Sequence, residues 1–367
     1  MHVPATLVRG GTSKCWLFDA AAVPTASDAL EALLVNAYGA ADPVQLDGVG
    51  GATPTTSKAA VVRRCAGPGA DVEYLFGQVG IGTGRVEWGS NCGNCATAIA
   101  LWSVARGLVP VTGDLTTVVL RNTNTGAVLE AEVDTTGGRV HEFGTQTVPG
   151  TRAGGVAVGL TFLDPAGGGT GALLPGGQVV ERLPVAGAEV RATLLDAGAP
   201  AVLVAAADLG RTGSEDTARM RADVELLRAV RRAAAVRMGL PADDDAVPKV
   251  GLVGPPAAAR TSLGERVTPA DHDVSVRMLS MNAPHPAIGL TSAVAVATAN
   301  LIAGSVVHES SAAAGAAAVR IATPAGVVPV RCSGGAGAAP TRVTVRRAAR
   351  ILCEADLLVP EIACPAS

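Results

Sequence analysis

The sequence has little net charge, few lysines and no long apolar run, and these shortages exclude several classes of function. A net charge of −3 leaves no basic field that would attract nucleic acid. No apolar run is long enough to span a bilayer, and the N-terminus lacks a charged segment followed by an apolar one. We therefore expect a cytoplasmic protein that binds neither nucleic acid nor a membrane.

The cysteines are odd in number and irregularly spaced in a long chain, which argues against a disulfide framework. The chain has seven cysteines in 367 residues, an odd number. Cys92 and Cys95 have the spacing of a redox pair or of half a zinc site, but no second pair of cysteines or histidines stands at ligand spacing. We expect no metal site, and Cys95 fits a small buried helix residue.

Only three of the 29 basic residues are lysine, and two of them end matching tripeptides. These are Thr12-Ser13-Lys14 and Thr56-Ser57-Lys58. Arginine stays charged near neutral pH, whereas burial can tune a lysine to exchange a proton. Against the alternative of chance surface lysines, this usage indicates that the two loops need an amine.

The segment from Ser90 to Gly107 predicts a loop that opens into a buried helix. Asn91-Cys92-Gly93-Asn94 supplies capping residue types, apolar residues follow at helical spacing, and Gly107 suits the stop. Free N–H groups and the positive end of the helix dipole would stabilise a Cys92 thiolate and attract an anion.

The chain is too long for one compact core, and its two halves resemble copies of one strand-and-helix unit. Ala5-Thr6-Leu7 recurs as Ala192-Thr193-Leu194, and a second small-residue loop and apolar helix run from Asn282 to Gly304. A Gly- and Pro-rich crossing covers 164–177. We expect one domain at 1–185 and another at 186–367, with the last strands packing on the first.

Coarser patterns complete the prediction of an α+β fold. Ser27 is predicted to cap a helix over 28–40, and a long helix is predicted over 217–238. Strands of a largely antiparallel sheet are predicted at 5–18 (two strands and a Gly-Gly turn), 59–63, 72–79, 116–121, 127–133 and 156–163. Further strands are predicted at 250–253, 274–279, 318–322, 327–331, 342–346 and 351–353.

Cys92 and Lys58 are the predicted acid/base pair, because a thiol and an amine can remove and return a proton next to a carboxylate. One substrate carboxylate would bind Thr12, Ser13 and Lys14, and another would bind Asn91 and Asn94. Two copies of the unit facing each other would place both helix N-termini at one cleft, suiting a small molecule with several carboxylates.

The second half offers Arg277 and His285, each with an alternative. Arg277 could form an interdomain salt bridge, and His285 could be a locally bonded histidine beside two prolines. A racemase with a mirror-image thiol pair would need a cysteine at the second helix, where the sequence has Thr291 and Ser292. A proton moved along an allylic system therefore fits better than inversion at one carbon.

Several motifs, in order and over nearly the whole chain, resemble the PrpF-type isomerases, which include 2-methylaconitate cis-trans isomerase, methylitaconate isomerase and 4-oxalomesaconate tautomerase. The motifs are Arg9-Gly10-Gly11-Thr12-Ser13-Lys14, Gly50-Gly51 with Thr56-Ser57-Lys58, Asn91-Cys92-Gly93-Asn94, Leu163-Asp164-Pro165-Ala166-Gly167, and Arg277-Met278-Leu279-Ser280-Met281 with His285.

The resemblance implies a diaminopimelate-epimerase-like fold, with two pseudo-symmetric domains that each wrap a sheet or partial barrel around a central helix. It implies a 1,3-proton shift in an unsaturated di- or tricarboxylate without a cofactor, with Lys58 and Cys92 catalytic. The expected substrate-binding residues are Thr12, Ser13, Lys14, Ser57, Asn91, Gly93, Asn94, Arg277, Met281 and His285.

Two departures from the family pattern leave the substrate open. Cys15 stands where the family has glycine, and Thr323-Pro324-Ala325-Gly326 replaces a His-Pro-Ser-Gly turn whose serine would touch a carboxylate. The alternatives are an amino-acid epimerase or racemase of the same fold, and a non-catalytic polycarboxylate-binding protein. The sequence also leaves open whether the chain forms a homodimer.

Overall fold

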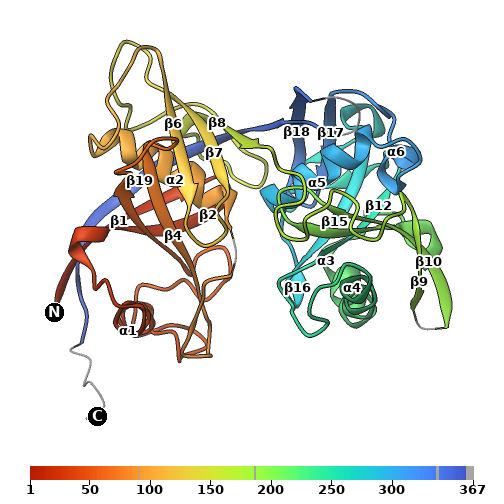
Figure 1. Ribbon diagram of the computed structural model, residues 1–367, viewed down its shortest axis with the longest axis horizontal. Coiled ribbons are helices and arrows are strands. Elements are labelled where there is room, and N and C mark those ends of the chain that lie inside the picture. The colour runs from red at the N-terminus through yellow and green to blue at the C-terminus, as the bar shows by residue number, and fades with distance from the viewer. Residues whose placement is uncertain (90, 186, 336–338, 361–367) are drawn as a thin grey trace. The chain divides into compact units, whose positions relative to one another are not determined.

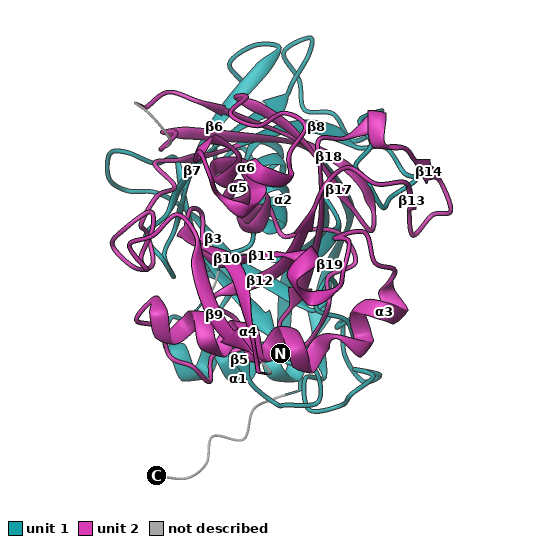
Figure 2. Cartoon of the chain, turned by 90° about the vertical axis from the view of Figure 1, so that its right-hand side faces the viewer, with its two compact units in different colours: residues 1–160, 347–367 teal, residues 161–346 magenta. Residues whose placement is uncertain are grey.

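A computed structural model of the chain describes residues 1–89, 91–185, 187–335 and 339–360 (Figure 1). Ser90, the first residue of the predicted helix-opening loop, lies outside the described residues. The chain divides into two compact units, coloured separately in Figure 2: unit 1 is Met1–Leu160 with Arg347–Ser367, and unit 2 is Thr161–Arg346.

Unit 1 is a mixed sheet with helices packed against its strands. Its elements are β1 (His2–Gly10), β2 (Ser13–Asp19), η1 (Ala20–Ala22), α1 (Ser27–Tyr38), β3 (Lys58–Arg64), β4 (Val72–Val79), β5 (Val86–Glu87), α2 (Gly93–Ala105), β6 (Leu115–Asn122), β7 (Val128–Asp134), β8 (Val156–Leu163) and the second part of β19 (Arg342–Leu358). The strands pair in the order β19–β1–β2–β3–β4–β6–β7.

Unit 2 repeats that arrangement with its own strands. Its elements are β9 (Glu181–Val185), β10 (Ala188–Asp196), β11 (Pro200–Ala205), η2 (Ala206–Leu209), α3 (Thr217–Ala222), α4 (Val224–Arg237), β12 (Lys249–Gly254), β13 (Ala259–Arg260), β14 (Arg266–Val267), η3 (Pro269–Asp271), β15 (Val274–Ser280), β16 (Ala283–Pro284), α5 (Leu290–Leu301), α6 (Val306–Ser310), β17 (Ala318–Thr323) and β18 (Gly326–Ser333). The strands pair in the order β9–β10–β11–β12–β15–β17–β18–β19.

The two units share one pairing pattern, which confirms the predicted repeat. From β1 to β7, and again from β10 to β18, successive pairs are antiparallel, parallel, antiparallel, parallel and antiparallel. Most strand pairs are therefore antiparallel, as predicted, and each unit also contains two parallel pairs. Each parallel pair needs a crossover, and each crossover carries a helix: α1, α2, α3 with α4, or α5 with α6.

A central helix forms the core of each unit. Every residue of α2 except Ala105 is buried, and α2 packs against β1, β2, β3, β6 and β7. Every residue of α5 except Leu301 is buried, and α5 packs against β10, β11, β17 and β18. Both helices are buried all round and consist mostly of apolar residues, as expected of a helix enclosed by its own domain.

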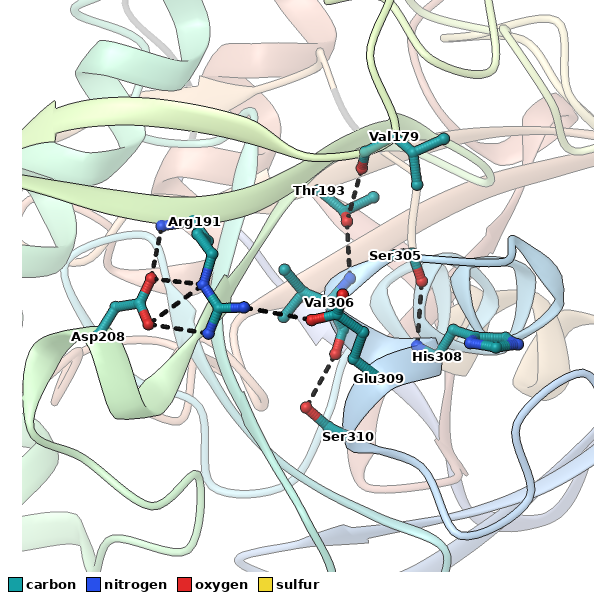
Figure 3. Close-up of polar contacts among 9 residues, drawn as sticks. All are labelled: Val179, Arg191, Thr193, Asp208, Ser305, Val306, His308, Glu309 and Ser310. Atoms are coloured by element: carbon teal, nitrogen blue, oxygen red, sulfur yellow. Dashed lines mark hydrogen bonds and ion pairs between the residues drawn. The ribbon is translucent and has the colours of Figure 1, made fainter.

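Matching threonines tie the strands of each unit to a helix. In unit 1, the hydroxyl oxygen of Thr6 on β1 accepts a bond from the indole of Trp102 on α2 at 3.0 Å. In unit 2, the hydroxyl of Thr193 on β10 donates to the carbonyl of Val179 and accepts from the N–H of Val306 at the start of α6 (Figure 3). The sequence repeat that contains both threonines therefore marks an equivalent strand in each unit.

Charged contacts hold η2 and α6 to the same strand of unit 2. Arg191 on β10 forms a forked pair with Asp208 and a further ion pair with Glu309 of α6 (Figure 3). Ser305 caps α6 by accepting the N–H of His308. These contacts keep the connection between α5 and β17 packed on the sheet.

Helix ends and strand lengths differ from the prediction in three places. Ala26, not Ser27, is the N-cap of α1, and it has no side-chain bond to the helix. The helix predicted over 217–238 is divided at Asp223, which ends α3 and precedes α4, and whose carboxylate accepts two bonds from Arg211. The strands predicted at 342–346 and 351–353 are one strand, β19, because its ladder with β1 continues through a register irregularity.

The division between the units falls after residue 160 instead of after 185. The crossing segment belongs with unit 2 because Gly167 donates to the carbonyl of Asp196, and Gly169 and Thr170 donate to its carboxylate. β9 follows and pairs with β10. The last part of the chain returns to unit 1, where β19 pairs with β1.

Candidate active site

The turn between β1 and β2 lies against the first residues of α2. A Cβ at Gly10 would stand 2.0 Å from the backbone oxygen of Asn94, so no larger residue fits there. The side-chain amide of Asn94 reaches the hydroxyl oxygens of Thr12 at 3.1 Å and Ser13 at 3.3 Å. Three of the predicted binding residues therefore form one polar cluster at the N-terminus of α2.

Cys92 is the N-cap of α2, where the sequence predicts it, with extended backbone angles and a half-buried side chain. The pKa of its thiol is raised well above its ordinary value by a hydrogen bond with Cys95 and by burial, while the nearby charge of Lys58 lowers it less strongly. The thiol is therefore protonated, whereas the position at a helix end suggested a stabilised thiolate.

A chain of three thiols explains this difference. Cys95, one turn into α2, bonds with Cys92 on one side and with Cys15 of β2 on the other. Burial and the Cys15 contact raise the pKa of Cys95 as well. Thiols bonded to thiols in a dry environment disfavour the anion, and here that effect exceeds the helix dipole.

Lys58 is the first residue of β3 and is 9% exposed. Its ammonium donates to the side-chain oxygen of Gln78 at 2.5 Å and lies 5.1 Å from the centre of the Phe76 ring. The backbone carbonyl of Lys58 accepts the hydroxyl of Tyr38. Among the described residues no carboxylate forms an ion pair with this amine, so the side chains that it contacts there, Gln78 and Phe76, are neutral.

The other predicted site residues of unit 1 form hydrogen bonds that hold the segments around Lys58 and Cys92 in place. The hydroxyl of Ser57 donates to the side-chain oxygen of Gln45 at 2.6 Å. The side-chain oxygen of Asn91 accepts from Tyr74 at 2.8 Å and from Asn122 at 3.1 Å. The carbonyl of Gly93 accepts the Thr97 hydroxyl, and Lys14, half-buried, donates its backbone N–H to Thr55.

Arg277, Met281 and His285 lie near one another in sequence on β15 and the turns that follow it, in unit 2. Arg277 is 2% exposed, and its guanidinium donates to the carbonyls of Glu215, Val276 and Ala322. Burial lowers its pKa to about 10. These three bonds hold β15 to its surroundings within unit 2, and substrate binding by Arg277 stays a prediction.

The other two predicted residues of unit 2 shape the turn that leads to α5. Met281 has a φ of 53°, and its carbonyl accepts the guanidinium of Arg231 at 2.7 Å. The ring Nδ1 of His285 accepts the N–H of Ala287 at 3.0 Å. Their contacts with a substrate also stay predictions.

Five residues of unit 1 that support the site were missed by sequence reasoning: Tyr38, Gln45, Tyr74, Gln78 and Asn122. Each bonds to the backbone or side chain of a predicted site residue.

In the part of the chain that the structure describes, no group of three or more His, Cys, Asp or Glu side chains is arranged to hold a metal ion. No helix there has both the length and the apolarity to cross a membrane.

Comparison with known proteins gives matches over most or all of the chain. The model of the family described as PrpF protein matches residues 1–360. The (4E)-oxalomesaconate Delta-isomerase of Novosphingobium sp. strain KA1 is 40% identical over 82% of this chain and 81% of its own. The 2-methyl-aconitate isomerase of Shewanella oneidensis is 34% identical over 98% of both chains.

A crystal structure of methylitaconate-delta-isomerase is similar to the structure over its full length. The TM-score is 0.83 at 27% sequence identity, and the match covers 100% of this chain and 99% of the other. This likeness confirms the predicted fold of two similar domains, each built around a central helix.

Proposed function

The chain belongs to the PrpF family and is an isomerase, and from this premise we propose that it moves a proton between two carbons of an unsaturated di- or tricarboxylate of the aconitate type. No cofactor takes part in the proposed reaction. The observation that carries the proposal is the pair of Lys58 and Cys92, an amine and a thiol close enough for the charge of one to shift the pKa of the other.

The proposed mechanism needs one group that takes a proton and one that gives a proton. Cys92 suits the donor, because its raised pKa keeps the thiol protonated. Lys58 in its neutral form takes the allylic proton, and the electron pair spreads over the double bond and the adjacent carboxylate. The thiol then protonates the far carbon, which moves the double bond by one position. Proton exchange between the two groups resets the site.

The polar cluster around Asn94 suits the carboxylates of such a substrate. The hydroxyls of Thr12 and Ser13 and the N-terminus of α2 lie together there, and oriented donors stabilise the charge that develops during deprotonation. The names of the matched relatives point to oxalomesaconate or 2-methylaconitate as the substrate. The turn at Thr323–Gly326 lacks the serine hydroxyl of the family pattern, and the Thr323 hydroxyl donates to the Gly326 carbonyl within the turn. This difference favours a substrate of the same class that differs from those of the relatives.

Two alternatives are tested together with the proposal. An epimerase of this fold needs a second acid/base thiol, but α5 begins at Leu290 after the N-cap Gly289, and no cysteine stands there. A polycarboxylate-binding protein without turnover would need neither Lys58 nor Cys92, so the presence of both favours the enzyme.

The decisive experiment is proton NMR in D2O without an added cofactor. The panel contains cis- and trans-aconitate, 2-methylaconitate, itaconate and 4-oxalomesaconate, with proline as the epimerase control. We expect deuterium at the allylic position of one acid together with its isomer, and neither with Lys58→Met. Exchange only at the α-carbon of proline would favour the epimerase. Binding of the acids without exchange would leave a binding protein.

A further inference from the structure

Arg347 on β19 is a buried cation for which the described chain offers no partner. It is 3% exposed, and its Nε has no hydrogen-bond partner. Burial alone lowers its pKa to about 10, with no acidic neighbour to oppose the effect. A charge taken out of water without a counter-charge is costly, so such a group in a native fold needs an explanation.

The other fully buried arginines show what a structural role looks like in this protein. Arg231 pairs with Asp245 at 3.1 Å and donates to the carbonyl of Met281. Arg277 donates to three carbonyls. Arg347 is equally buried and has neither kind of contact among the described residues.

Arg347 lies beside the polar cluster at the start of α2. Its Cδ is 3.6 Å from the point where a Cβ of Gly11 would stand, and the side-chain oxygen of Asn94 is 2.2 Å from the same point. That oxygen is buried and has no partner either. Two polar side chains, both more than nine-tenths buried and each with an atom that lacks a hydrogen-bond partner, therefore flank one residue of the β1–β2 turn.

The side-chain amide of Asn94 can also donate a hydrogen bond on the side that faces Gly11 and Arg347. Its nitrogen is assigned toward the hydroxyls of Thr12 and Ser13, but a hydroxyl can donate as well as accept. With the amide turned over, the oxygen accepts from those hydroxyls and the nitrogen faces the side of Gly11 and Arg347. The amide then presents an N–H group beside Gly11, the residue that the Arg347 side chain also approaches.

We propose that Arg347 and Asn94 together bind one carboxylate of the substrate beside the N-terminus of α2. A guanidinium matches a carboxylate in a planar, two-bond geometry, and the bond is strong where water is excluded. The proposal rests on the function proposed above, because the counter-charge of Arg347 is then a carboxylate of the substrate. It also assigns to Arg347 the carboxylate-binding role that was predicted for Lys14.

The test compares Arg347→Met with Arg346→Met, an exposed neighbour on the opposite face of the same strand. The probe is tricarballylate, a saturated tricarboxylate that cannot undergo an allylic shift, titrated by calorimetry together with the acids of the NMR panel. We expect Arg347→Met to weaken binding by about tenfold or more, the effect of one charged hydrogen bond, and Arg346→Met to leave it unchanged.

Thermal unfolding separates binding from a structural role. Without ligand, Arg347→Met should melt no lower than the wild type, because it removes an unpaired charge. It should lose the rise in Tm that tricarballylate gives the wild type. A lower Tm without ligand, combined with unchanged affinity, would overturn the proposal. So would a wild-type protein that binds none of the acids.

A second variant keeps the test decisive if Arg347→Met does not fold. Arg347→Lys keeps the charge and the stem but loses the forked geometry, so affinity should fall and KM should rise more than kcat falls. Unchanged affinity in this variant would contradict the proposal. If the wild type binds acids but turns none over, the isomerase function fails, while the affinities of the variants still decide the role of Arg347.

Discussion

Lys58 and Gln78 are directly paired residues of neighbouring antiparallel strands, and the ammonium of one donates to the side-chain oxygen of the other at 2.5 Å. The amide nitrogen of Gln78 donates to the carbonyl of Ser57 at 2.9 Å. That second bond fixes which end of the amide faces the amine. Gln78 therefore aims the Lys58 amine without adding a charge to it.

Replacing Gln78 should impair turnover more than binding. We expect Gln78→Leu to lower kcat by about tenfold or more with little change in KM, because the amine loses its orientation while the carboxylate contacts stay. Gln78→Glu should also lower kcat, because a carboxylate would hold the proton on the amine. Steady-state kinetics on the acid identified by NMR measures both variants. Full activity in Gln78→Glu would contradict a proton-accepting role for Lys58.

The contact between Cys95 and Cys92 gives a prediction about pH. Because the bond with Cys95 is the largest cause of the raised pKa of Cys92, Cys95→Ala should lower that pKa toward its ordinary value. The rate of alkylation of Cys92 by iodoacetamide should then rise at a lower pH than in the wild type. Mass spectrometry of the modified peptide identifies the thiol.

Cys332→Ala is the matched control for this experiment. Cys332 is a buried thiol of β18 whose pKa is raised to about 11 by burial alone. Its removal should leave the alkylation profile of Cys92 unchanged. An identical profile in Cys95→Ala and the wild type would show that the thiol chain does not hold the proton on Cys92.

Residue pattern alone was enough to predict the framework of the site. The capping types around Cys92, the apolar run after it and the repeated Ala-Thr-Leu strand located α2 and the two-unit fold, because these features are local. The match between Lys58 and Gln78 could not be predicted, since it depends on the register of two strands. The protonated state of Cys92 could not be predicted either, since it depends on the bond with Cys95 and on burial, which outweigh the helix end that the capping residues indicated.

β9 was missed for a different reason. Its buried and exposed residues alternate from Glu181 to Val185, but Pro184 and the preceding Gly-rich crossing are typical of a loop. Pro184 lies on the exposed face of the strand, so it interrupts the apolar pattern without preventing the ladder with β10. The boundary predicted after residue 185 followed from that interpretation.

The close approach of β1 to α2 predicts that Gly10 tolerates no side chain. In Gly10→Ala the new methyl would stand 2.0 Å from the carbonyl oxygen of Asn94 and 2.8 Å from the backbone nitrogen of Ala98, so strand and helix must separate. We expect a loss of about 1–3 kcal/mol in the free energy of unfolding, as for other overpacked sites, and a fall in kcat because α2 carries Cys92. Urea unfolding and steady-state kinetics measure the two effects.

Gly67→Ala is the control for this substitution, because a Cβ there meets nothing within 4 Å. It should change stability and activity little, since Gly67 lies outside the set of positive-φ glycines. Equal stability of Gly10→Ala and Gly67→Ala would mean that β1 and α2 do not pack as closely as the structure shows.

The bond between Asp223 and Arg211 makes the stability of unit 2 depend on pH. Both guanidinium contacts are 2.7 Å long, and they lower the pKa of Asp223 more than its burial raises it. A lowered pKa in the folded state gives stability that is complete above the unfolded pKa of about 3.9 and is lost as pH falls below it. Asp223→Asn should lower the free energy of unfolding at pH 7 by about 3 kcal/mol, because it leaves a largely buried guanidinium without its charge partner.

The difference between the wild type and Asp223→Asn isolates this pair, because the other carboxylates titrate in both proteins. We expect the difference to be constant from pH 7 to pH 5 and to shrink as pH falls below about 4, where the unfolded carboxylate takes up a proton before the folded one does. All three tryptophans lie in unit 1, so unfolding is followed by circular dichroism instead of fluorescence. Asp356→Asn, at an exposed pair with His2, should change stability by less than about 0.5 kcal/mol at pH 7. A difference for Asp223→Asn that stays the same down to pH 3 would show that the Arg211 pair does not set the acid stability of unit 2.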